Sequence, residues 1–163
     1  MSTSQSPKSI VVTSGYFDPL HEGHIELFEL ASELGELIVI INNDAQNLAK
    51  KVKQGQKPQM SAESRLRVIK SLRMVKDAFI SIDEDETVRN SLVVAAREYG
   101  ASIFAKGGDR YAYEIPEAAI CREHNIQIVD GLGDKIQSSS ALIANVQIVP
   151  DAIDTRVVLR QIL

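Results

Sequence analysis

Residues 15–24 of this sequence read Gly-Tyr-Phe-Asp-Pro-Leu-His-Glu-Gly-His. An apolar, β-branched run precedes them at residues 10–13, and an amphipathic segment follows them at residues 25–34. This order predicts a strand, a tight loop that contains glycine, and then a helix. Because the free N–H groups at the start of such a helix point into the loop, the stretch predicts an anion-binding site.

Two imidazoles stand at the mouth of the expected helix. His21 and His24 are separated by three positions, so they share one helical face and can donate hydrogen bonds to the same phosphate group. Gly23 between them leaves room for a ligand to lie against the backbone. A simpler interpretation is that one histidine caps the helix and the other lies at the surface.

The pattern Gly-x-Phe-Asp-x-x-His-x-Gly-His resembles the signature of the cytidylyltransferase-like nucleotidyltransferases. This resemblance implies that His21 and His24 stabilise the pentacoordinate transition state as an α-phosphorus is attacked and pyrophosphate leaves. It also implies that further residues of the stretch bind the nucleotide. These are Gly15, Tyr16, Phe17, Asp18 and Gly23.

Bulk composition sets limits on the protein class. The 163 residues fit one domain, and a net charge of −4 gives no global basic field for nucleic acid or anionic lipid. Phosphate binding must therefore be local. The single cysteine, Cys121, excludes an internal disulfide framework and fits a reducing compartment. We expect a cytoplasmic protein with neither a nucleic-acid nor a membrane partner.

Apolar runs alternate with helical patterns along most of the chain, which predicts a single Rossmann-like α/β domain over residues 9–145. The run at residues 37–41 is continuously aliphatic, as in strands buried on both faces of a parallel sheet. We expect about five parallel strands with helices on both faces. The strands are expected at 10–13, 37–41, 78–82, 102–105 and 126–129. Residues 1–8 read as a disordered tail and residues 146–163 as a helical extension or dimer surface.

Positive charge is concentrated in residues 45–60, which contain Lys50, Lys51, Lys53 and Lys57. A solvated basic loop is the simpler interpretation, but the segment follows a strand end on the expected ligand side. A triphosphate clamp is therefore favoured. The stretch from Lys57 to Arg65 also resembles the family's second signature. That resemblance implies that Arg65 holds the β- and γ-phosphates, with Lys53 and Lys57 as helpers.

Two later motifs complete the expected nucleotide site. Lys106, Gly107, Gly108 and Asp109 end the fourth strand, and their glycines let backbone approach a ribose and base. Ser138, Ser139 and Ser140 open an apolar-periodic segment, where a helix start lined with hydroxyls suits an anion. Arg110 and Tyr111 follow the glycines and are assigned to the acceptor.

The reaction implied by the resemblance is attack of a phosphate or phosphonate oxygen on the α-phosphorus of a nucleoside triphosphate. The first signature and the serine motif favour CTP, whereas residues 106–109 resemble the ATP-using heptose-phosphate enzymes. Mg²⁺ is expected to enter with the triphosphate. The expected assembly is a homodimer. Two other classes stay open: a non-catalytic nucleotide sensor, and a metalloenzyme that uses His21 and His24 as ligands.

Overall fold

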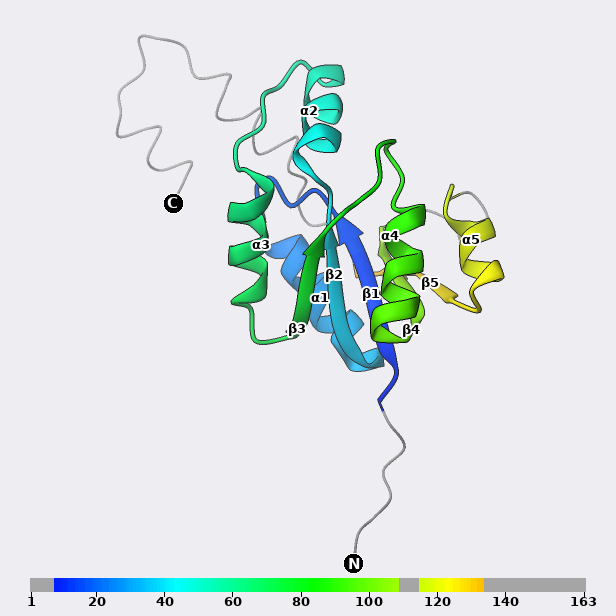
Figure 1. Ribbon diagram of the computed structural model, residues 1–163. Coiled ribbons are helices and arrows are strands. Elements are labelled where there is room, and N and C mark those ends of the chain that lie inside the picture. Colours follow the sequence, from blue (N-terminus) through cyan, green and yellow to red (C-terminus); the bar gives the residue numbers. More distant parts are fainter. Residues whose placement is uncertain (1–7, 109–114, 134–163) are drawn as a thin grey trace, which may run out of the picture.

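The computed structural model of this chain describes residues 8–108 and 115–133. Its centre is a five-stranded sheet in the order β3-β2-β1-β4-β5, in which every neighbouring pair is parallel (Figure 1). The strands are β1 (Ile10–Gly15), β2 (Glu36–Ile41), β3 (Val75–Ile80), β4 (Ala101–Gly107) and β5 (Gln127–Leu132). The predicted α/β fold with a parallel sheet is confirmed.

Helices cover both faces of the sheet. Residues from α1 and α3 pack with Val11 of β1 in one core cluster, whereas residues from α4 and α5 pack with Val12 in the other. Adjacent residues of one strand therefore face opposite layers. The helical elements are α1 (Glu22–Leu34), α2 (Asp44–Lys53), α3 (Ala62–Lys70), α4 (Arg89–Val94), the π-helical η1 (Ala95–Tyr99) and α5 (Ala118–Glu123).

The chain order reverses between β1 and β4. From β1 the chain runs outward through β2 to β3, then crosses back to place β4 on the other side of β1. Ligands of open α/β sheets bind beyond the carboxyl ends of the strands at such a reversal. The segments after β1 and β4, which carry two of the predicted motifs, therefore lie at the same edge.

Gly35 follows α1 without the left-handed conformation that commonly ends helices. Its φ is 162°, which is extended backbone. A Cβ at this position would lie 2.2 Å from the backbone oxygen of Ser9, so the glycine is needed for close approach of two chain segments. The left-handed position is found instead at Gly100, which ends η1 with a φ of 73°.

The basic segment is helical where a loop was expected. Asn43 and Gln46 form a reciprocal capping box at the start of α2, which then carries three lysines in its last turn. The helix that precedes β5 is α5, which begins at Ala118. The predicted tail and the extension at 146–163 lie outside the described residues, apart from Lys8. No helix in the described ranges is long and apolar enough to cross a membrane.

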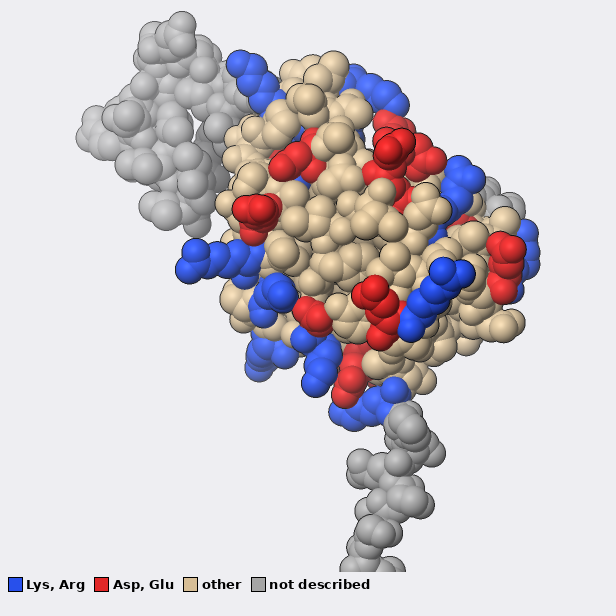
Figure 2. All heavy atoms as spheres, viewed as in Figure 1, with Lys and Arg blue, Asp and Glu red and all other residues tan. Residues whose placement is uncertain are grey.

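Charged side chains are mixed over the surface. On the face shown in Figure 2, acidic and basic groups are interspersed and do not separate into fields of one sign. This distribution agrees with the small net charge of −4. This face therefore offers no extended basic field for phosphate.

Candidate active site

His21 and His24 form the first turn of α1 together. His21 is the N-cap, and its Nδ1 accepts a hydrogen bond from the N–H of Gly23 at 3.1 Å. Nδ1 of His24 accepts in return from the N–H of His21 at 3.2 Å. The two rings stack, with centroids 3.7 Å apart. They therefore share one face as predicted, and the simpler interpretation is right only in that His21 caps the helix.

The capping bonds decide where each imidazole carries its proton. Because both Nδ1 atoms accept an N–H, the proton of each neutral ring lies on Nε2. The pKa of His24 is lowered to about 3, mainly by burial and also by nearby His21 and Lys50. Burial also lowers the pKa of His21. At neutral pH the pair presents two adjacent Nε2–H donors without a positive charge.

This protonation state can be tested by titration. We expect His24 to stay neutral, with its proton on Nε2, from about pH 8 down to about pH 5, because its pKa is far below the ordinary value of 6.5. The unfolded chain takes up the proton first as the pH falls, so His24 makes the folded state less stable below pH 6.5. Nitrogen-15 NMR of the imidazoles measures this directly; protonation of His24 near its ordinary pKa would contradict the described burial.

Phe17 packs against the histidine pair through its contact with His24. Its side chain is 2% exposed, and its ring lies edge-on to His24 at 4.9 Å and to Phe28 at 5.2 Å. Phe17 has a φ of 53°, and a Cβ on Gly15 would meet its ring at 2.7 Å. Both residues were predicted to bind nucleotide. The structure gives Phe17 a packing role and explains Gly15 by the closeness of that ring.

Asp18 is fully buried under the same loop. Its Oδ2 accepts hydrogen bonds from the side chain of Asn47 and from the N–H of Gln59, both at 2.8 Å. Its backbone oxygen accepts from Nζ of Lys51 at 2.7 Å, and Lys51 is itself only 1% exposed. These contacts join the loop to α2 and to the segment before α3. They indicate that Asp18 orients the loop.

Arg65 was predicted to hold the β- and γ-phosphates, but its side chain is buried. Only 1% of the residue is exposed. One guanidinium nitrogen donates to the backbone oxygens of Tyr16 and Asn42 at 2.8 and 2.7 Å. Others donate to Met60 at 3.2 Å and to Asp44 at 3.4 Å. The guanidinium therefore ties together the segments that follow β1 and β2.

The predicted lysines do not act as one group. Lys53 lines a cavity and forms an ion pair with Glu86, whereas Lys57 is exposed and is not among the residues that line that cavity. Lys50, which was not predicted individually, has its ammonium 4.1 Å from the centre of the Tyr16 ring. It also lies close enough to His24 to lower the pKa of that imidazole. Lys50 therefore connects the cavity to the histidine pair.

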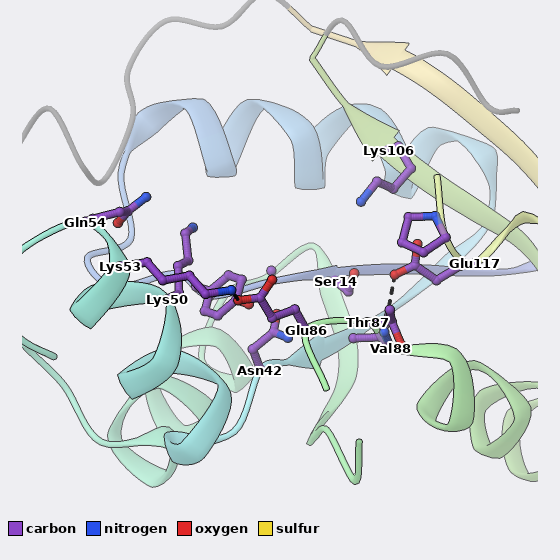
Figure 3. A pocket seen from close by; sticks show the side chains of 13 residues that line it. Ser14, Asn42, Lys50, Lys53, Gln54, Glu86, Thr87, Val88, Lys106 and Glu117 are labelled. Atoms are coloured by element: carbon purple, nitrogen blue, oxygen red, sulfur yellow. Dashed lines mark hydrogen bonds and ion pairs between the residues drawn. The ribbon is translucent and has the colours of Figure 1, made fainter. Parts of the chain in front are cut away.

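A cavity of about 780 Å³ opens at the carboxyl ends of β1, β2 and β4 (Figure 3). This volume suits a small-molecule ligand. Tyr16, Gly15, Lys53 and Lys106 were predicted to bind ligand, but most of the lining was not. Lys50 was expected only as part of the basic segment, and the lining residues missed by the sequence reasoning are Ser14, Asn42, Gln54, Glu86, Thr87, Val88, Pro116 and Glu117. Glu86 belongs to an acidic run that reads as a solvated loop, and Glu117 has no motif around it.

Several predicted residues fall outside the part that can be described. Gly107 ends β4, and Gly108 follows with a φ of 81° that favours glycine. The remaining predictions at Asp109, Arg110, Tyr111, Ser138, Ser139 and Ser140 lie outside the described residues. Their assignments stay predictions.

The described side chains can be checked for their ability to bind the expected metal ion. Within residues 8–108 and 115–133, no group of three or more His, Cys, Asp or Glu side chains could hold a metal ion. The two imidazoles cap a helix through Nδ1 and have no third ligand in this part of the chain. The described residues therefore do not form a metal site by themselves, and Mg²⁺ would depend on oxygens of the triphosphate.

A model of the family described as cytidylyltransferase-like matches residues 12–148. The chain belongs to the cytidylyltransferase-like family. The match spans β1, the histidine pair, the cavity and all five strands. The resemblance seen in the sequence is thereby confirmed.

Relatives of this cytidylyltransferase-like chain are nucleotidyltransferases. It is 34% identical over 142 residues to the bifunctional protein HldE of Streptomyces coelicolor, which covers 83% of the chain and 28% of HldE. The chain spans about a quarter of the length of the HldE proteins that it matches. It is 28% identical to the D-beta-D-heptose 1-phosphate adenylyltransferase of Bordetella bronchiseptica, over 86% of the chain and 83% of that enzyme.

A solved structure agrees with the fold. The lipopolysaccharide core biosynthesis protein from Thermoplasma volcanium is 26% identical and superposes with a TM-score of 0.56. The alignment covers 76% of this cytidylyltransferase-like chain and 95% of the other. The described domain thus corresponds to nearly all of that protein.

Proposed function

We propose that this chain transfers AMP from ATP to the phosphate group of a sugar phosphate and releases pyrophosphate. The observation that carries the proposal is the pair of Nε2–H donors that His21 and His24 present side by side, within reach of the charge of Lys50, which lines the cavity. Two fixed donors at one point suit the charge that develops on a phosphoryl group during substitution.

The proposed reaction is a direct substitution at the α-phosphorus. An oxygen of the acceptor phosphate forms a bond to that phosphorus, and the bond to the bridging oxygen of pyrophosphate breaks. His21 and His24 donate hydrogen bonds to the non-bridging oxygens of the α-phosphate, which gain charge in the transition state. Lys50 and Lys53 supply positive charge nearby. The cavity positions the acceptor, so the chemistry requires no covalent enzyme intermediate.

Arg65 has a positioning role in this proposal. It fixes the backbone oxygens of Tyr16 and Asn42, and Lys51 fixes that of Asp18. These bonds fix the loop that precedes α1. They thereby fix the position of the first turn of α1, which carries His21 and His24. This positioning role replaces the phosphate-binding role first expected for Arg65, and its support is that the guanidinium is buried and each of its nitrogens donates a hydrogen bond.

ATP replaces the CTP that the sequence favoured as donor. The support is the Bordetella bronchiseptica relative, which matches most of its own length and is named an adenylyltransferase of heptose 1-phosphate. Residues 106–109, which resemble the heptose-phosphate enzymes, agree with this choice. Mg²⁺ is part of the proposal as an ion that binds the triphosphate and offsets its charge when present.

Pyrophosphate release from a nucleotide panel tests this function. With hexose and heptose 1-phosphates as acceptors, we expect ATP to support release at least about tenfold faster than CTP, which corresponds to roughly 1.4 kcal/mol of discrimination. Turnover with CTP alone would restore the cytidylyltransferase assignment. Tight ATP binding with no turnover on any acceptor would support the nucleotide sensor instead.

A further inference from the structure

Different charged side chains line the two ends of the cavity, and Lys106 lies at the same end as Glu117 (Figure 3). Lys50 and Lys53 project into one end from α2, and Glu117 lies at the opposite end, at the start of α5 (Figure 3). Glu86 lies between them and is paired with Lys53. A ligand that is anionic at one end and donates hydrogen bonds at the other fits this arrangement.

The basic end of the cavity is the end nearest the imidazole pair. The ammonium of Lys50 is 4.1 Å from the ring centre of Tyr16, and its charge reaches His24. A phosphate beside Lys50 would therefore lie beside the Nε2–H donors. Since the acceptor phosphate must meet the α-phosphorus there, the remainder of the acceptor extends toward Glu117.

Glu117 is held in place before any ligand arrives. The residue is 6% exposed, and its Oε1 accepts a hydrogen bond from the N–H of Val88 at 3.2 Å (Figure 3). An ionised carboxylate has about four acceptor positions. Because Glu117 also lines the cavity, it can accept further hydrogen bonds from hydroxyl groups of a ligand.

A cationic group would suit this end less well than hydroxyl groups do. Lys106 reaches into the same part of the cavity from β4 (Figure 3). Its ammonium would repel a ligand amine, whereas hydroxyl groups carry no charge and can donate to the carboxylate. The lining as a whole holds three lysines and two glutamates, so a dianionic phosphate remains favoured.

We propose that Glu117 determines acceptor specificity by accepting hydrogen bonds from the hydroxyl groups of a sugar phosphate whose phosphate lies at the Lys50 end. The inference rests on the proposed function in taking this cavity as the acceptor site. It adds the residue that distinguishes a polyhydroxylated acceptor from a simple phosphate. Its test uses binding, which does not require turnover.

The experiment compares two classes of ligand on three proteins by isothermal titration. The ligands are a panel of hexose and heptose 1-phosphates and, as the simple phosphate, ethyl phosphate. We expect the wild type to bind its best sugar phosphate at least about tenfold more tightly than ethyl phosphate. Ethyl phosphate has no hydroxyl group to donate to the carboxylate, and the loss of one hydrogen bond to a charged group has an effect of this size. Glu117→Gln should abolish most of that difference while its amide oxygen still accepts from Val88. Glu123→Gln, an exposed glutamate on the same helix, should retain it.

Each alternative result has a distinct meaning. Equal binding of the two ligand classes by the wild type, or equal weakening of both in Glu117→Gln, would overturn the role of Glu117 and leave adenylyl transfer untouched. Failure of ATP to yield pyrophosphate, with the Glu117-dependent preference intact, would overturn the proposed function alone. If Glu117→Gln unfolds at the same temperature as the wild type, a change in binding does not result from a less stable fold.

Discussion

Replacing His24 by alanine is expected to lower kcat by about a hundredfold or more while leaving the Kd for ATP nearly unchanged. The imidazole is proposed to donate to the α-phosphate in the transition state, where its hydrogen bond is strongest. Ground-state binding of ATP draws mainly on other groups, such as Lys50 and Lys53. Single-turnover kinetics together with equilibrium binding of ATP separates the two effects.

The His24→Ala variant requires a control for loss of stability. His24 packs on Phe17 and caps the backbone of His21, so the free energy of unfolding has to be measured alongside activity. His124→Ala is a matched control, because His124 follows α5 and is not among the residues that line the cavity. Equal losses of ATP affinity and kcat in His24→Ala would contradict a transition-state role.

Arg65→Ala is expected to destabilise the fold by about 3–5 kcal/mol. The substitution leaves a cavity and removes the donors of the buried backbone oxygens of Tyr16 and Asn42. Unpaired buried acceptors and lost packing both favour unfolding. Urea denaturation measures the change, and Arg65→Lys is expected to recover only part of it, because an ammonium cannot reproduce the planar set of donors.

The two roles considered for Arg65 give opposite results. A phosphate clamp predicts a large loss of ATP affinity with little change in stability. A buried guanidinium with a structural role predicts instead a loss of stability that is larger than the loss of ATP affinity. Arg67→Ala is the matched control, because Arg67 is an exposed arginine of the same helix and should change the free energy of unfolding by less than about 0.5 kcal/mol.

The strands could be predicted from the sequence because their side chains are buried on both faces. Residues 37–41 of β2 are each at most 1% exposed, which requires an uninterrupted aliphatic run. The histidine loop was equally predictable, since a strand, a glycine-containing turn and a capped helix each leave a local pattern. Adjacent patterns of this kind also place His21 and His24 on one face.

Helix α2 could not be found from hydrophobic periodicity, because its buried face is polar. Gln46, Asn47 and Lys51 are each at most 2% exposed, whereas Leu48 and Val52 on the same helix are 52% and 65% exposed. The polar face donates to the loop around Asp18 and to the segment after β3. The usual rule that apolar residues point inward therefore assigns the wrong face. The capping pair at Asn43 and Gln46 was the available signal.

The cavity was only partly predictable for a related reason. Burial of Arg65 depends on contacts with four residues of three segments, and arginine is among the residue types most often exposed. Glu117 lies in sequence 93 positions after His24 and comes near the site only through the fold of β4 and α5. Neither role leaves a local pattern in the chain.

The proposed catalysis depends on contact between the histidine pair and the α-phosphate. The most direct test is a crystal structure of this chain with a non-hydrolysable ATP analogue. We expect Nε2 of both His21 and His24 to lie about 2.7–3.2 Å from non-bridging oxygens of the α-phosphate. A bound analogue whose α-phosphate lies away from both imidazoles would contradict it.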